Sequence, residues 1–138
     1  MNVPTSLQGK DINGYTDAAH ARKERFHKDG KKFMKELAAA LGITDACDIR
    51  SNKAGPAVSG EVSLHGDHIY VQLSGSYHEG PQLLYRSCKN RKDYTGGTNN
   101  FISMEKLASS LQARDNFVKH CKSLMAAAQE VAGAAVSA

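Results

Sequence analysis

The chain has 138 residues, which fits one domain, since single domains usually run to ~100–200 residues. Hydrophobic residues make up 41% and charged residues 23%, a balance typical of a folded globular protein and not of a disordered one. No apolar run approaches the ~20 residues that cross a bilayer, so we expect no membrane partner. The first residues lack a basic start followed by an apolar core, so we expect no secretory signal.

The formal net charge is +4 at pH 7, an excess that allows an anionic partner without requiring one. The three cysteines, Cys47, Cys88 and Cys121, are odd in number, widely spaced and without a CxxC pair. A disulfide scaffold would have an even number at close spacing. We therefore predict three reduced thiols and a cytoplasmic location.

Residues 1–15 contain glycines, a proline and an asparagine that break any periodic pattern, which predicts a flexible lead-in to one domain over 16–132. A helical apolar stripe follows, made of Ala19, Phe26, Phe33, Met34, Leu37 and Leu41. Thr16 or Asp17 suits the N-cap and Gly42 the C-terminal position. These signals predict a helix over 17–41, in which Gly30 marks a kink or a close packing contact.

Residues 42–56 have the composition of a connecting loop. Two segments then alternate apolar and polar residues, as half-buried strands do, with Val58, Val62 and Leu64 in the first and Ile69, Val71 and Leu73 in the second. Gly66 and Asp67 between them predict a tight hairpin turn. A third strand is predicted over 82–88, with Leu83 and Tyr85 on one face.

Residues 89–100 are polar and contain glycine, which predicts another loop. Ser103 then caps a second helical region with a break near 110–115, and the tail over 133–138 is expected to fray. The order is helix, three strands, helix. We predict an α+β fold, in which a three-stranded antiparallel meander is packed by an N-terminal and a C-terminal helix.

The first predicted helix carries a basic face. At about 100° per residue, this face lies opposite Phe26, Phe33 and Leu37, and it consists of Arg25, Lys28, Lys31, Lys32 and Lys35. Such a face produces a field that could hold phosphates. The alternative is an ordinary solvated helix face, which usually mixes signs in i,i+4 pairs; Glu24–Lys28 is such a pair.

A second basic segment follows the third predicted strand. It contains Arg86, Lys89, Arg91 and Lys92, and the aromatic residues Tyr85, Tyr94 and Phe101 flank it. Cations interleaved with aromatic rings are typical of single-strand recognition, so we predict phosphate contacts here and stacking by Tyr94. The N–H groups of Gly96 and Gly97 could bind an anion, although a turn explains these glycines equally simply.

The segment LYRSCKNRKDYTGGTNNF, with the preceding strand GEVSLHGDHIYVQL, resembles a family of small uncharacterised proteins carried on bacterial plasmids and integrative elements. The resemblance covers about residues 60–105. It implies a cytosolic accessory protein of a mobile element, and it supplies no catalytic residue.

The histidines and Cys88 are the candidate residues for metal binding and for nucleophilic catalysis. His65 and His68 flank one turn and His78 lies in the next, and these turns fall at opposite ends of a meander, so we expect no metal and no cofactor. The cations around Cys88 favour a thiolate. A Cys-His-Asp set with His78 and Asp93 would need loops to bring these residues together, so we interpret Cys88 as a partly buried thiol and predict no enzyme.

The sequence therefore predicts a small non-enzymatic binding protein whose basic surface contacts nucleic acid or a nucleic-acid-handling complex, so its expected partner is nucleic acid or an acidic protein surface. The alternative is a protein-interaction module, such as a homodimer formed through the apolar C-terminal helix, where Ala126, Ala127 and Ala128 would permit close helix approach.

Overall fold

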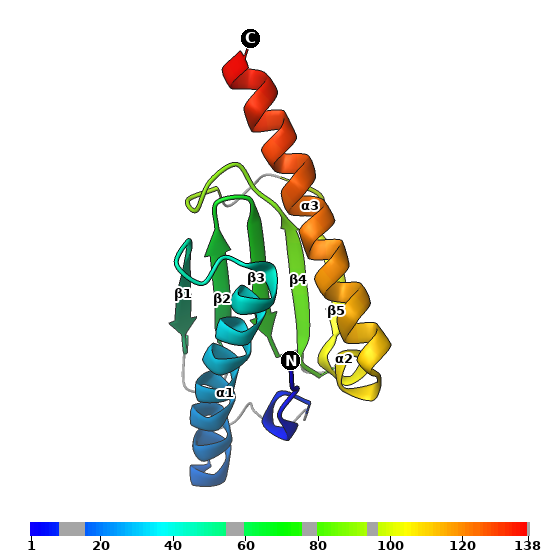
Figure 1. Ribbon diagram of the computed structural model, residues 1–138. Coiled ribbons are helices and arrows are strands. Elements are labelled where there is room, and N and C mark those ends of the chain that lie inside the picture. The colour runs from blue at the N-terminus through cyan, green and yellow to red at the C-terminus, as the bar shows by residue number, and fades with distance from the viewer. Residues whose placement is uncertain (9–15, 55–59, 76–79, 94–96, 138) are drawn as a thin grey trace.

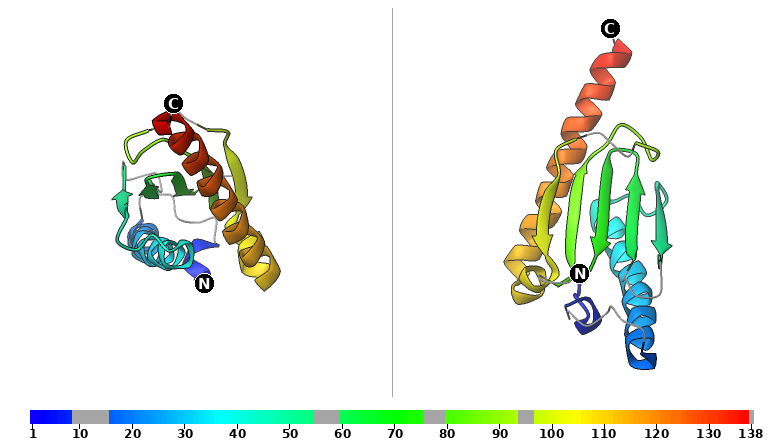
Figure 2. Two further views of the ribbon diagram at one scale, coloured as in Figure 1. Left: turned by 45° about the horizontal axis from the view of Figure 1, so that its top comes forward. Right: turned by 180° about the vertical axis from the view of Figure 1, so that it is seen from behind.

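The computed structural model describes residues 1–8, 16–54, 60–75, 80–93 and 97–137. Its α+β architecture is a five-stranded antiparallel sheet with helices α1 and α3 on the same face (Figure 1). Figure 2 shows, from behind, the second face of the sheet, on which no described helix packs. The strands follow chain order from β1 to β5 across the sheet.

Helix α1 (Asp17–Leu41) has the predicted bounds. The hydroxyl oxygen of Thr16 accepts a hydrogen bond from the backbone N–H of Ala19 at 3.1 Å and so satisfies one of the free donors of the first turn. At the other end, Gly42 has φ of +73°, and its N–H bonds to the carbonyls of Ala38 and Ala39. Both caps were predicted from the residue types alone.

Gly30 lies where α1 packs tightly against the sheet. A Cβ atom at this position would lie 3.0 Å from Val62 Cγ2 and 3.1 Å from Leu73 Cδ2. Gly30 is buried within a continuous helix. Of the two predicted roles, the structure therefore supports the close packing contact.

The sheet has five strands where the sequence predicted three, which corrects the predicted meander. The three central strands are close to those predicted: β2 (Glu61–Gly66), β3 (Ile69–Ser74) and β4 (Gln82–Ser87). The additional strands are the two edges, β1 (Cys47–Asn52) and β5 (Asn100–Ser103). Both edges overlap segments that were predicted as loops.

The β2–β3 hairpin also differs by one position from the prediction. Gly66 still belongs to β2, where it pairs with Cys47 of β1. The connection is made by Asp67 and His68. Gly66 remains part of the strand because it pairs with β1, an edge strand that the sequence did not predict.

The core lies between the sheet and the two long helices. Its fully buried members come from α1, from the inward positions of β2 to β4, and from the two C-terminal helices; among the largest are Phe26, Phe33, Met34, Leu37, Leu64, Leu73, Leu83, Met104 and Leu107. Part of the segment predicted as a flexible lead-in joins this core, because Thr5–Leu7 forms the short 3-10 helix η1 and Leu7 is fully buried. The hydroxyl of Ser6 also donates to Asp29 of α1 at 2.6 Å.

The C-terminal helical region is divided, as predicted, at Ser110. Helix α2 (Met104–Ser109) begins at the predicted cap Ser103, and extended backbone at Ser110 separates it from α3 (Leu111–Ser137). Helix α3 packs Phe117, Cys121 and Met125 into the core. It then continues past the end of the sheet (Figure 1), across 133–137, where fraying was expected. Among the described helices, none has both the length and the apolar character needed to cross a membrane.

Candidate nucleic-acid interface

The predicted basic face of α1 points away from the sheet. Helix α1 buries Phe26, Phe33 and Leu37 against the strands, so the opposite side of the helix faces solvent. We call four exposed residues on that side the lysine stripe: Lys28, Lys31, Lys32 and Lys35. Seven basic and four acidic residues in α1 give this single helix a charge of +3, most of the net +4 of the chain.

Two carboxylates beside the lysine stripe, Glu24 and Asp29, have partners outside the helix. Glu24 accepts hydrogen bonds from Lys53 Nζ at 2.8 and 2.7 Å, and this contact lowers the pKa of the Glu24 carboxyl. The predicted Glu24–Lys28 pair is therefore replaced by a pair between α1 and the end of β1. Asp29 accepts from Ser6. Within the described residues, none of the four lysines of the stripe forms a direct ion pair.

The second predicted basic segment does not form one exposed patch. Arg86 is only 5% exposed, and its guanidinium carbon lies 4.7 Å from the centre of the Tyr70 ring. The strand alternation directs Arg86 to the face opposite the helices, where it packs on Tyr70 of the neighbouring strand. This corrects the prediction that Arg86 presents its charge to phosphates.

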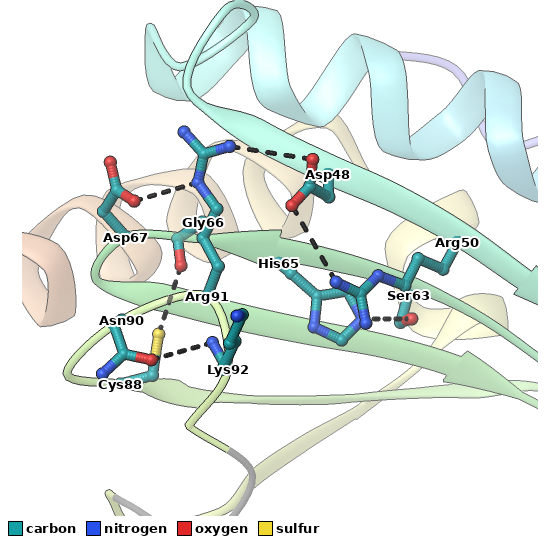
Figure 3. A network of polar contacts seen from close by, with 10 residues as sticks. All are labelled: Asp48, Arg50, Ser63, His65, Gly66, Asp67, Cys88, Asn90, Arg91 and Lys92. Atoms are coloured by element: carbon teal, nitrogen blue, oxygen red, sulfur yellow. Dashed lines mark hydrogen bonds and ion pairs between the residues drawn. The ribbon is translucent and has the colours of Figure 1, made fainter.

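Arg91 is tied to two carboxylates at the end of the sheet (Figure 3). Its Nε donates to Asp67 Oδ1 at 2.9 Å, and its Nη1 lies 3.7 Å from Asp48 Oδ1. The hydrogen bond to Asp67 is the main reason that the pKa of Arg91 is raised. Arg91 therefore joins the loop after β4 to β1 and to the β2–β3 turn, and much of its charge is compensated within the protein.

Lys89 and Lys92 are the exposed cations of this loop. Short backbone-to-side-chain bonds shape the loop: the N–H of Lys89 donates to Asp93 Oδ2 at 2.9 Å, and that of Lys92 to Asn90 Oδ1 at 2.8 Å. Tyr94, the predicted stacking residue, and Gly96 lie outside the described residues.

Gly97 fits the turn interpretation. Its φ is +79°, and a Cβ atom there would come within 2.4 Å of the Ser87 carbonyl oxygen. A side chain is therefore excluded both by backbone conformation and by space. The need for glycine follows from loop geometry and requires no anion.

The two predicted basic regions occupy different parts of the molecule. The loop with Lys89 and Lys92 is anchored at the end of the sheet (Figure 3), whereas the lysine stripe lies on the side of α1 opposite its buried residues. Of the nine residues predicted to bind anions, the four of the lysine stripe share one exposed side of one helix, and none of the four forms a direct ion pair with a described residue.

Cys88 is a buried thiol. It is 5% exposed, and its Sγ donates to the carbonyl of Gly66 at 3.4 Å (Figure 3). Burial is the largest cause that raises the pKa of Cys88 to about 11, with the charge of Asp93 next. At neutral pH the group is therefore a thiol and not the thiolate that nucleophilic attack requires.

A cavity of about 520 Å³ lies beside Cys88, between α3 and the end of the sheet. His68 and Asp93 also line it, together with Ala128, Val131 and Ala132 of α3. His68 Nδ1 is buried without a hydrogen-bond partner, and the Cys88 thiol is directed to a backbone carbonyl. His78, the histidine considered for a catalytic set, lies outside the described residues.

Among the residues that the structure describes, no group of three or more His, Cys, Asp or Glu is placed to hold a metal ion. Cys47, Cys88 and Cys121 are all free.

The sequence did not predict that one face of the sheet is left uncovered by helices (Figure 2). We call it the open face. Its central row crosses all five strands through paired residues, in the order Arg50, Ser63, Gln72, Leu84 and Phe101. Phe101 is 59% exposed, one of few large hydrophobic side chains in such a position. Its place in a row becomes visible only once β5 is known to be a strand.

No protein-family model, curated protein or solved structure matches this chain.

Proposed function

We propose that this protein is a small non-enzymatic binding protein that contacts the phosphate backbone of nucleic acid through the lysine stripe. The observation that carries the proposal is that four exposed lysines lie on one side of one helix, without an ion pair among the described residues. A resemblance to accessory proteins of plasmids and integrative elements would make it an accessory factor of a mobile element.

The dimensions of the stripe suit a polyanion. Lys28 and Lys35 are seven residues apart, which corresponds to about 10.5 Å along a helix. Phosphates follow one another at about 3.4 Å along each strand of a duplex, so the stripe can neutralise several of them. Lysines are flexible point charges, which suit contacts to phosphate and carry no sequence information.

Fluorescence anisotropy with a labelled 20-base-pair DNA duplex and a labelled 20-nucleotide single strand at low salt tests the proposal. The triple variant Lys28→Gln, Lys32→Gln and Lys35→Gln should bind at least tenfold more weakly than the wild-type chain. The matched control is the triple variant Lys106→Gln, Lys119→Gln and Lys122→Gln. These three lysines are exposed on α2 and α3, and their replacement changes the net charge of the chain by the same amount. Equal losses in both variants, or no binding by the wild-type chain, would contradict the proposal.

A specific observation also favours a second function, an assembly module that dimerises through α3. The last turns of this helix extend beyond the sheet (Figure 1), and Val131 there is 71% exposed. Ala126 and Ala127 are exposed nearby, and small side chains let helices approach closely. Sedimentation equilibrium should then give a dimer that Val131→Asp dissociates; a monomer at all accessible concentrations would exclude this function.

A further inference from the structure

We propose that the outer edge of β1 is an interface between two copies of this chain, in which the two β1 strands pair antiparallel about a two-fold axis at Ile49. The two five-stranded sheets then form one continuous sheet. This inference goes beyond the proposed function, since it uses neither the lysine stripe nor the exposed end of α3.

Strand β1 is an open edge of the sheet. It is the first strand in the sheet order and pairs with β2 on its inner side, and none of the described elements lies beyond its outer side (Figures 1 and 2). In an edge strand, alternate backbone N–H and C=O groups find no partner within their own sheet, and this row of groups is a template for another strand. A second strand would complete the ladder of β1.

The features by which proteins usually close an edge are missing from β1. Its six residues equal the length of β2, β3 and β4, and its register with β2 runs through all six without a bulge. It contains neither proline nor lysine. The opposite edge differs, because β5 has only four residues and α2 packs beside it. Of the two edges, β1 is therefore the one prepared for another strand.

The side chains of β1 favour a second copy as the occupant. On the face away from the helices, the strand carries Asp48 and Arg50, two half-exposed side chains of opposite sign (Figure 3). Between them, Ile49 lies on the helix side and packs partly against the core. Opposite charges on either side of one central residue are self-complementary. When a second β1 is turned by 180° about Ile49, each Asp48 lies opposite the partner's Arg50.

Charge selects this register over the neighbouring ones. Pairing about Ile49 makes two opposite-charge pairs across the interface. An axis at Asp48 would instead place two aspartates directly opposite each other, and an axis at Arg50 would do the same with two arginines. Opposite charges in such cross-strand positions stabilise a sheet, and like charges destabilise it. A slip by a single residue is excluded, because it would pair residues from opposite faces.

The present contacts of β1 are compatible with this pairing. Asp48 lies 3.9 Å from Arg50 of its own chain and 3.7 Å from Arg91. Since a carboxylate can accept several hydrogen bonds, Asp48 can keep Arg91 while it accepts from the partner's Arg50. On the helix side, Ser51 Oγ lies 2.7 Å from His27 Nδ1 of α1, a contact that holds the strand against its own helix and that the partner strand does not displace.

The pairing also fixes how the two protomers are oriented. Residues directly opposite in an antiparallel pair point to the same face, so the helices of both protomers cover the same side of the joined sheet. Both lysine stripes then face the same way and can contact one polyanion together. This consequence rests on the proposed function, whereas the interface itself does not.

Sedimentation velocity of the full chain at increasing concentration tests the interface. A single strand pair buries little surface, so we expect a weak dimer that forms as the concentration rises. Arg50→Asp and Asp48→Arg each place like charges across the axis and should dimerise at least about fivefold more weakly than the wild-type chain. Lys122→Asp, which changes the net charge as much as Arg50→Asp at an exposed position of α3, is the control and should stay within twofold of the wild-type affinity.

Mixing the two charge variants gives a result that a folding defect cannot imitate. In the mixed dimer, both cross-strand pairs again join an aspartate to an arginine. The mixture should therefore associate at least about fivefold more tightly than either variant alone. A wild-type chain that stays monomeric at every accessible concentration, or a mixture that associates no better than its components, overturns the inference.

Engineered cysteines test the register, in a Cys47→Ser background that removes the half-buried thiol of β1. Ile49→Cys brings two thiols to the axis, where paired Cα atoms lie about 4.5–5.5 Å apart, within the range that a disulfide bridges. Oxidation with glutathione disulfide should then give a covalent dimer on a non-reducing gel. Asn52→Cys is the matched control, because two copies of residue 52 are offset by about 20 Å along the strands. Equal cross-linking of both variants contradicts an axis at Ile49.

The outcomes separate this interface from the other proposals. A dimer that Val131→Asp dissociates and Arg50→Asp does not is formed by α3, and the β1 inference is overturned. If Arg50→Asp dissociates the dimer and Val131→Asp does not, the β1 interface is supported and dimerisation through α3 fails. If the dimer forms through β1 while the lysine-stripe variant binds DNA as tightly as the wild-type chain, the proposed function fails and this inference stands.

Discussion

The guanidinium of Arg86 lies over the ring of Tyr70 at 4.7 Å, and both side chains are almost fully buried. The same ring receives the edge of His65, and the Tyr70 hydroxyl donates to Gln72 at 2.7 Å. A charge buried in such a cluster stabilises the sheet instead of meeting a ligand. This contact explains why a residue predicted to bind phosphate has a structural role.

Replacing Arg86 should therefore affect folding more than binding. Arg86→Met removes a desolvated cation–π contact worth up to about 2 kcal/mol and some packing, so we expect the free energy of unfolding to fall by about 1–3 kcal/mol in urea titrations. Arg25→Met, on the exposed side of α1, is the control and should stay within about 0.5 kcal/mol. Unchanged stability with weaker nucleic-acid binding would show that Arg86 contacts the ligand after all.

The close approach of α1 to the sheet makes Gly30 sensitive to size. Gly30→Val places atoms where Val62 and Leu73 already pack, and overpacking of this kind costs about 1–3 kcal/mol. Gly133→Ala is the opposite case, because nothing lies within 4 Å of the new methyl group, and the better helix former should add up to about 1 kcal/mol. Equal thermal midpoints for the two variants would contradict the packing described for α1.

The thiols should differ in reactivity according to burial. Burial raises the pKa of Cys88 to about 11 and that of Cys121 to about 12, so neither is ionised to a useful degree at pH 8. Cys47 is only half-buried and should react first with the disulfide reagent DTNB, with the other two reacting fully only after unfolding. Fast modification of Cys88 in a Cys47→Ala variant would reopen the interpretation of this cysteine as a nucleophile.

His65 should make stability depend on mildly acidic pH. Burial is the main cause of its lowered pKa, and the charge of Arg50 adds to it. Since the folded state holds this imidazole neutral, the unfolded state takes up its proton first as the pH falls below about 6.5, and stability is lost on the acid side. The urea midpoints at pH 7.5 and pH 5.5 should therefore differ less for His65→Gln than for the wild-type chain. An equal difference would exclude His65 as a source of the pH dependence of stability.

Local signals explain which parts of the fold could be predicted. Helix α1 was predicted to the residue because Thr16 and Gly42 cap it chemically and its apolar stripe is long. The strands β2 and β3 alternate strictly, with Val62 and Leu64 in one and Val71 and Leu73 in the other. Each of these features depends on neighbours in sequence and needs no tertiary information.

The edge strands required information that the local sequence lacks. Cys47 and Ile49 alternate with charged residues in β1, but turn-forming residues surround this short pattern, and pairing with β2 decides its structure. Strand β5 has four residues, too few for a period to show. Without these strands neither the open face nor the position of Phe101 on it could be foreseen.

The candidate site was predictable only where it depends on one helix. The lysine stripe follows from helical spacing alone, and the structure leaves it exposed. The environment of the other two arginines depends on contacts across strands and turns. Arg86 packs on Tyr70, and Arg91 pairs with Asp48 and Asp67. Such partners come from distant parts of the chain. Counting cations along the sequence therefore overestimated how much positive charge the second basic segment exposes.

The salt dependence of binding tests the central claim most directly. For the wild-type chain, log K for a DNA duplex should fall linearly with log salt concentration, with a slope that reflects the phosphates neutralised. Replacing Lys28, Lys32 and Lys35 should make that slope shallower by up to about three, one for each lost phosphate contact, while replacing Lys106, Lys119 and Lys122 should leave it unchanged. Equal slopes for the wild-type chain and the stripe variant would contradict the assignment of the lysine stripe as the phosphate-binding surface.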